Sequence, residues 1–235
     1  MTFLGIDLHS NCFTCCFINN DGVKTKINFN LNSPELQKFY KLLTFDTCVM
    51  VEASTNTFKF VELIKDKVKV VYVANTHKLK LISLVKKKTD KIDAEKLAIF
   101  LKMQIISGEE LVKPVYIPEK TIQNLRSLFT DYKLFRRQVG MIKNRIHSIL
   151  KQNLKPFTKQ YIFGKANRIN IKNIDLPEIP KYQINVLFEQ LECIEKQIKD
   201  IEQIIKLVGS KYYKQIDILT SMKGISIMTA IAIIS

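Results

Sequence analysis

The sequence lacks the features that mark membrane-spanning, secreted and disulfide-linked proteins. No run of apolar residues approaches the ~18–20 that a membrane-spanning helix needs. No basic stretch followed by a long apolar run precedes Asp7, so a secretory signal is not expected. The five cysteines are an odd number, and we expect reduced thiols rather than a disulfide framework. Only seven glycines are present, which disfavours an actin-like ATPase, because such an enzyme needs glycine-rich phosphate loops.

The proportions of hydrophobic and charged residues are those of an ordinary globular protein, but the net charge is unusual. Hydrophobic residues make up 46% and charged residues 25% of the 235 positions, which excludes a disordered or collagen-like chain. This length suits one large domain or two small ones. Lysine and arginine number 37 against 22 acidic residues, a formal net charge of +15. A polyanionic partner is therefore expected, because neutralising phosphates releases condensed counterions.

The positive charge is concentrated in the middle of the chain. Residues 1–74 carry eight basic and seven acidic residues, and residues 166–235 carry nine and eight. Residues 75–165 carry twenty basic and seven acidic residues, a net of +13. Solubility alone does not require such segregation, so this segment is predicted to bind nucleic acid. A solvated basic helix face without a ligand is the alternative.

The first 105 residues alternate strand and helix signals and predict a small α/β domain. Three strand-like runs come first, and helices alternate with strands after them, which is typical of a mixed sheet with helices on its faces. Ser33 is predicted to cap the first helix, with Pro34 at its first turn. Strands are expected at residues 2–6, 12–18, 24–30, 47–51 and 69–74.

From Ile122 onwards the pattern becomes helical. A connector rich in proline is expected at residues 153–180, followed by a helix at 182–208. Steps of three and four residues define a coiled-coil seam in that helix, at Ile184, Leu187, Leu191, Ile194, Ile198, Ile201, Ile205 and Val208. The seam could pair with the preceding basic helix or with another subunit, and the sequence does not separate these two.

Four carboxylates occur where a metal site would need them. Asp7 and Glu52 end two predicted strands, and they would emerge side by side if these strands were sheet neighbours. Asp90 and Asp93 are three apart, so on a helix they share one face. Hard divalent ions such as Mg²⁺ take oxygen ligands, and two such ions can drive phosphodiester chemistry. Asp90 and Asp93 could instead be first-turn acids that the helix dipole favours.

Three short blocks resemble the signature of the insertion-sequence-110 family of DEDD transposases. They are Gly5-Ile6-Asp7-Leu8-His9, Val51-Glu52-Ala53-Ser54 and Lys88-Thr89-Asp90-Lys91-Ile92-Asp93-Ala94. The resemblance implies a ribonuclease-H-like fold akin to the resolvase RuvC over residues 1–105. It assigns Asp7, Glu52, Asp90 and Asp93 as the catalytic tetrad that binds Mg²⁺. A basic helix and coiled-coil region would follow at 106–213, and the start of a helix–hairpin–helix-like second domain at 214–235.

The resemblance also implies partners. Family members move their own element, choose DNA ends and targets with a structured bridge RNA, and assemble as dimers or tetramers through the coiled coil. We accordingly expect a cytoplasmic, nucleoid-associated protein of a bacterium or archaeon. The residues predicted to contact nucleic acid are Lys86, Lys87, Lys88, Arg126, Lys133, Arg136, Arg137, Lys143, Arg145 and Lys151.

The chain departs from the family pattern at three places. Asn75-Thr76 replaces the usual Asn-Pro, and Ser226 replaces the second hairpin glycine. The sequence ends at Ser235, before the family's catalytic serine, so a truncated gene product or N-terminal fragment is expected. Two functions remain open. The chain is either a Mg²⁺-dependent DNA transposase or a remnant that binds nucleic acid and oligomerises without cutting.

Overall fold

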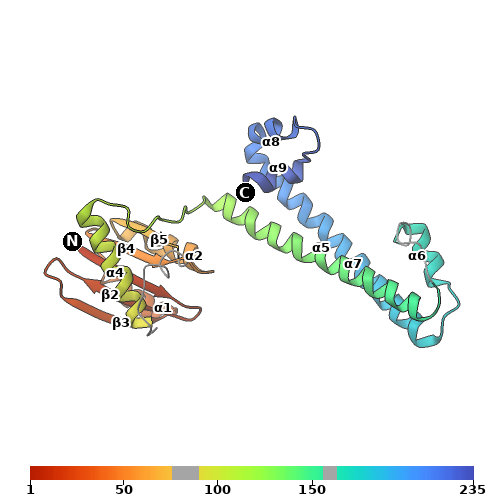
Figure 1. Ribbon diagram of the computed structural model, residues 1–235, viewed down its shortest axis with the longest axis horizontal. Coiled ribbons are helices and arrows are strands. Elements are labelled where there is room, and N and C mark those ends of the chain that lie inside the picture. The colour runs from red at the N-terminus through yellow and green to blue at the C-terminus, as the bar shows by residue number, and fades with distance from the viewer. Residues whose placement is uncertain (76–89, 156–162) are drawn as a thin grey trace. The chain divides into compact units, whose positions relative to one another are not determined.

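The computed structural model describes residues 1–75, 90–155 and 163–235 (Figure 1). The contacts divide the chain into two compact units, Met1–Ile117 and Pro118–Ser235. Lys86, Lys87 and Lys88 lie outside the described residues. No helix in the described part of the chain is long and apolar enough to cross a membrane. The functional domain boundaries that the sequence suggests stay a prediction, since they group residues by motif rather than by contact.

The first unit is built on a five-stranded mixed sheet. Its strands are β1 (Thr2–Leu8), β2 (Cys12–Ile18), β3 (Lys24–Asn30), β4 (Thr47–Glu52) and β5 (Val70–Ala74). The spatial order is β3-β2-β1-β4-β5. The pairs β1–β2 and β2–β3 are antiparallel, whereas β4 runs parallel to both β1 and β5. β1 therefore lies at the centre, between the hairpin strands and the parallel pair.

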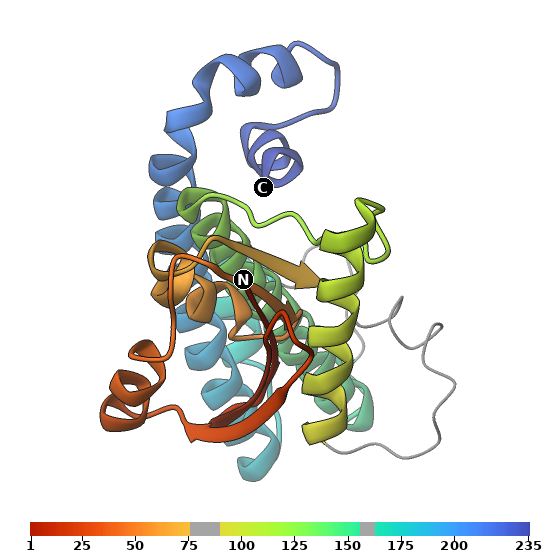
Figure 2. The ribbon, with the colours of Figure 1, turned by 90° about the vertical axis from the view of Figure 1, so that its left-hand side faces the viewer.

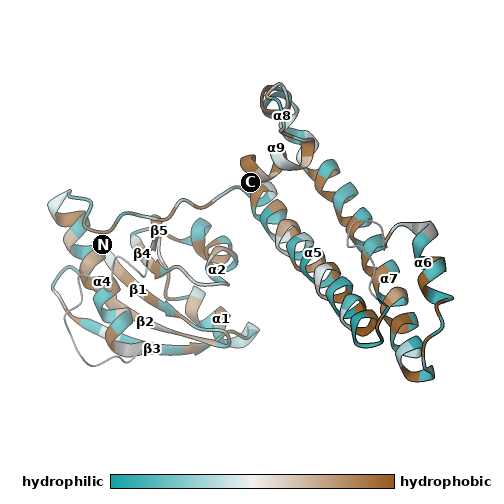
Figure 3. Ribbon diagram, turned by 45° about the vertical axis from the view of Figure 1, so that its right-hand side comes forward, coloured by the Kyte–Doolittle hydropathy of each residue, from teal (hydrophilic) through white to brown (hydrophobic). Residues whose placement is uncertain are grey.

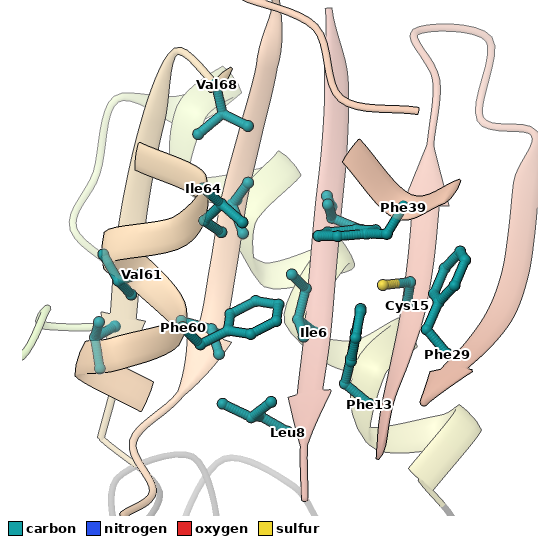
Figure 4. Packing of buried hydrophobic residues seen from close by; sticks show 14 residues of the cluster. Ile6, Leu8, Phe13, Cys15, Phe29, Phe39, Phe60, Val61, Ile64 and Val68 are labelled. Carbon is teal, nitrogen blue, oxygen red and sulfur yellow. The ribbon is translucent and has the colours of Figure 1, made fainter. Parts of the chain in front are cut away.

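Helices cover both faces of this sheet (Figure 2). On one face, α1 (Ser33–Tyr40) and α2 (Thr57–Ile64) bury an aromatic cluster in which Phe13 contacts the rings of Phe29, Phe39 and Phe60 (Figure 4). On the other face, α4 (Asp90–Ser107) packs through the apolar side of its helix. Strand alternation explains the division, because successive side chains of β1 point to opposite faces. This mixed sheet with flanking helices is the α/β architecture that the sequence predicts, and it agrees with the ribonuclease-H-like fold that the family resemblance implies.

Two long helices form the second unit. They are α5 (Lys120–Gln152) and α7 (Glu178–Gly209). The carboxyl half of α5 packs against the amino half of α7, since Ile146 and Leu150 share a buried cluster with Phe188. The amino end of α5 and the carboxyl end of α7 meet in a second buried cluster, which includes Leu125 and Ile205. The helices are therefore an antiparallel hairpin, and Figure 3 shows hydrophobic residues on one side of each helix and hydrophilic residues on the other.

The predicted seam of α7 is largely the surface that packs on α5. Ile184, Leu191, Ile198, Ile201 and Ile205 are buried there. Of the two pairings left open by the sequence, the structure shows the one with the basic helix of the same chain. Pairing with a second subunit stays a prediction.

Shorter helices complete the second unit. α8 (Tyr213–Thr220) and α9 (Ile227–Ile234) are joined by a turn in which Gly224 has a φ of +94°, a conformation that glycine adopts readily. α9 packs close to the end of α7, because a Cβ on Gly209 would lie 2.8 Å from the Ile231 side chain.

Two local predictions are wrong. The cap of α1 is Asn32, whose side chain accepts a hydrogen bond from the Glu35 backbone N–H at 3.1 Å, and Ser33 is already helical. The expected connector at 153–180 contains a helix, α6 (Lys165–Lys172). Arg168 stabilises it through a bidentate pair with Glu195 of α7, each contact at 2.7 Å. That long-range ion pair left no periodic signal in the sequence.

Candidate active site and nucleic-acid surface

Asp7 and Glu52 occupy neighbouring positions at the ends of two parallel strands. The register pairs Gly5 with Met50 and Ile6 with Val51, so one further step brings Asp7 beside Glu52. Alternation along the strands puts both residues on the face that α4 covers, together with Gly5 and Met50. The condition stated from the sequence, that these two strands are neighbours, is confirmed.

The direction of α4 brings its first turns to the same end of the sheet. A Cβ on Gly5 would lie 2.1 Å from the Ala94 carbonyl oxygen and 2.4 Å from the Ala98 nitrogen, so the helix backbone rests directly on β1 there. Further back along β1, the Lys102 ammonium lies 5.8 Å from the centre of the Phe3 ring. α4 therefore runs antiparallel to β1. Asp93 and Asp90, which precede Ala94, belong to the end of the helix nearest Asp7.

The contacts of the individual carboxylates differ. Asp7 is only 6% exposed, and its Oδ2 lies 3.3 Å from Nε2 of His9. Asn56 donates from its side-chain amide to the His9 carbonyl oxygen at 2.9 Å and so holds that segment. On α4, Lys96 donates to Oδ1 of Asp93 at 3.3 Å. Among the side chains that the structure describes, no group of three or more histidine, cysteine, aspartate or glutamate residues is gathered closely enough to hold a metal ion.

A compact turn positions Glu52. The hydroxyl of Thr57 donates to the Glu52 carbonyl oxygen at 2.7 Å and accepts from the Ser54 backbone N–H at 2.8 Å. Thr57 is 1% exposed and is the first residue of α2. The hydroxyl thus ties the end of β4 to the start of the helix. Sequence reasoning overlooked Thr57, although a threonine five residues after a strand-end acid offered a weak signal.

Thr14 is a second residue that the sequence reasoning overlooked. It is the direct cross-strand partner of Asp7 and is 3% exposed. A buried threonine next to a buried aspartate extends the polar row across the sheet from β4 to β2. Its one sequence signal is its place within an otherwise apolar strand.

An ion-pair clamp holds the start of α4 against the edge of the sheet. The Glu95 carboxylate accepts from Lys24 at 2.6 Å and from Lys26 at 2.5 Å, one lysine on each oxygen. Both lysines lie on β3, two residues apart and so on the same face. The hydrogen bonds from Lys24 and then Lys26 lower the pKa of the Glu95 carboxyl below its ordinary value.

The cysteines of β2 belong to no group of possible metal ligands among the residues that the structure describes. Cys15 and Cys16 are both fully buried, Cys15 on the aromatic side of the sheet and Cys16 under α4. Burial raises the pKa of both thiols, which keeps them protonated. Cys15 and Cys16 therefore belong to the hydrophobic core.

All but one of the basic residues predicted on α5 lie on its outer surface. Those that are exposed are Arg126, Lys133, Arg136, Arg137, Arg145 and Lys151. Lys143 is half-buried, 3.9 Å from the Glu195 carboxylate and with its ammonium 5.1 Å from the centre of the Phe163 ring. Asp131 is the one acidic residue in the sequence between Arg126 and Lys151. At one end, Nε of Arg126 donates to the Ser235 carbonyl oxygen at 2.5 Å.

Taken together, these features define a class of protein. A ribonuclease-H-like sheet presents acids at the ends of its central strands, and a helical unit carries a basic outer face, as expected of an enzyme that acts on nucleic acid. The family model of the insertion-sequence-110 DEDD transposases, described as transposase, matches residues 4–154. The chain therefore belongs to this transposase family, and DNA is its partner. The comparison with curated proteins gives no match.

Proposed function

We propose that this transposase cleaves and transfers DNA strands with divalent metal ions held by Asp7, Glu52, Asp90 and Asp93. The observation that carries the proposal is the adjacency of Asp7 and Glu52 in the parallel register, with the first turns of α4 directed to the same end of the sheet. An all-oxygen donor set of this kind suits Mg²⁺.

When bound, Mg²⁺ would supply activation of the attacking oxygen and stabilisation of the leaving oxygen. The residues around the site have separate tasks. His9 orients the Asp7 carboxylate, while Lys96 offsets part of the Asp93 charge. Burial of Asp7 keeps its carboxylate in one position, so the strand end is rigid where the substrate phosphate would lie.

The basic residues of α5, together with Lys86, Lys87 and Lys88, are proposed to hold the backbones of DNA and of a structured guide RNA. Exposed arginines suit this task, because the guanidinium fork binds phosphate oxygens bidentately. The family resemblance supports the RNA part of this proposal, and the one-sided charge of α5 supports the phosphate contacts.

A second copy of the chain is proposed to pack on the outer side of α7. That side exposes large apolar residues, including Tyr182, Ile204 and Leu207. Cys193 is exposed on the same helix, while Cys15, Cys16 and Cys48 are buried. Mild oxidation should therefore cross-link two copies through Cys193 if the outer faces of α7 meet, and a Cys193→Ser variant should stay uncross-linked.

Strand cleavage in the presence of Mg²⁺ or Mn²⁺ tests the catalytic proposal. The parent should nick DNA that carries ends of the element, and Asp7→Asn should not, while both should bind the DNA equally well. Asp66→Asn is the matched control, since it removes the same charge from an exposed site of the same unit. DNA binding without nicking by the parent and by the control would instead identify a non-catalytic nucleic-acid-binding protein.

A further inference from the structure

A glycine lies in the interior of α5 where nothing in the described part of the chain requires it. Gly140 is exposed, and a Cβ built on it would meet no atom within 4 Å. Glycine is among the poorest residues for a helix interior, because it loses the most backbone entropy. Gly209 offers a contrast, since its missing side chain makes room for Ile231. Gly140 thus weakens the helix without improving the packing that the structure shows.

The neighbours of Gly140 on the helix surface are mostly cations. Residues three and four positions away are adjacent on a helix. They are the exposed Arg136 and Arg137 on one side, and the half-buried Lys143 and the exposed Asn144 on the other. Bare backbone is therefore exposed at the centre of a basic surface.

We infer that Gly140 is the point at which the backbone of duplex DNA lies closest to α5. This inference rests on the proposed function, in which the α5 face binds nucleic acid. A missing side chain lets a sugar-phosphate backbone approach the helix, and Arg136 and Arg137 then reach phosphate oxygens beside the point of approach. From Arg126 to Lys151 the basic face extends over about 38 Å, slightly more than one turn of duplex.

Charge decides between DNA and a second copy of the chain as the occupant of this surface. Two acids of α7 that lie near α5 are already engaged, because Glu195 pairs with Arg168 and Lys143, and Glu202 contacts Tyr132. Two copies meeting through this face would bring Arg136 and Arg137 against their counterparts, which is repulsive. A polyanion is attracted by the same arrangement.

Substitution at Gly140 separates binding from folding. Gly140→Ala should keep or raise the thermal stability, because alanine is the better helix former, yet lower the affinity for a short DNA duplex about threefold. Gly140→Leu should lower that affinity about tenfold, since its larger side chain holds the backbone further away. Both are measured by fluorescence anisotropy with the full chain, beside a thermal melt.

Two further variants make the outcomes distinguishable. Ser127→Leu adds similar bulk at an exposed position of α5 whose neighbours three and four residues away include no cation, so it should bind as the parent does. Arg137→Ala should bind more weakly. Parent-like affinity of Gly140→Leu with weakened Arg137→Ala would overturn the inference and leave the proposed function intact. Parent-like affinity of both would defeat the binding face as well.

Two further measurements on Gly140→Leu are its affinity for an RNA hairpin and its oligomeric state by analytical ultracentrifugation. If Gly140→Leu lost affinity for RNA and kept it for DNA, the assignment to DNA would be overturned. If the variant changed the oligomeric state and not the DNA affinity, the surface would be a contact between copies of the chain, which also contradicts the inference.

Discussion

Charged residues are arranged in opposite ways in the two units of this transposase. In the sheet unit, acids far apart in sequence are brought to one end of the sheet, and Asp7 is almost fully buried there. In the helical unit, cations from one continuous helix spread over an exposed face. The first arrangement depends on the tertiary fold being correct, whereas the second depends only on helix periodicity. Damage to the fold of the sheet unit should therefore abolish the site formed by its acids at once. Removal of single cations should instead weaken nucleic-acid binding by the basic face in steps.

The largest effect is expected at Gly5, where α4 rests on β1. Gly5→Ala places a Cβ against the backbone of Ala94, so the helix must shift, at a cost of about 3 kcal/mol in the free energy of unfolding. Urea denaturation measures this loss. Gly140→Ala is the matched control, because it adds the same methyl group where space is open. Equal stability of the two variants would show that α4 does not pack on β1 as described.

The basic face should respond in proportion to the charges removed. Replacing both Arg136 and Arg137 by Gln should reduce DNA affinity and lower the slope of log affinity against log salt by roughly two. Replacing Lys214 and Lys223, which lie outside α5, removes the same charge and should change the slope little. Identical slopes for the two double variants would mean that net charge alone, and not the α5 face, governs binding.

The contrast between the units also explains what the sequence could predict. Three strand-like runs followed by alternating helices and strands predicted the sheet, and the seam of α7 predicted a long paired helix. The sequence predicted Asp7 and Glu52 as neighbours only on the condition that their strands are adjacent, and the parallel register of β1 and β4 meets that condition. The Glu95 clamp was not, since Lys24 and Lys26 are about seventy residues away from it and ion pairs leave no periodic pattern. α6 was overlooked for the same reason, because Arg168 finds its partner on another helix.

The smallest effect is expected at the clamp itself. Glu95→Gln weakens the tie between α4 and β3 but leaves the apolar contact at Gly5, so thermal stability should fall by less than in Gly5→Ala. The folded pKa of Glu95 is lowered, so its contribution is complete above the ordinary pKa of 4.5 and lost as the pH falls through the folded value. The stability difference between parent and variant should therefore shrink in acid.

Thermal melts at neutral and acidic pH follow this difference. Glu62→Gln is the control, because its pair with Lys59 is local to α2 and exposed, and such pairs contribute little. A difference between parent and Glu95→Gln that stayed constant into acid would contradict the clamp.

In the proposed mechanism the acids of the sheet unit share a divalent ion, and Mn²⁺ binding can be followed by electron paramagnetic resonance. The parent and Asp66→Asn should bind Mn²⁺ alike, and Asp7→Asn should bind at least about tenfold more weakly. Equal binding by Asp7→Asn and the parent, or no binding by the parent, would contradict the account.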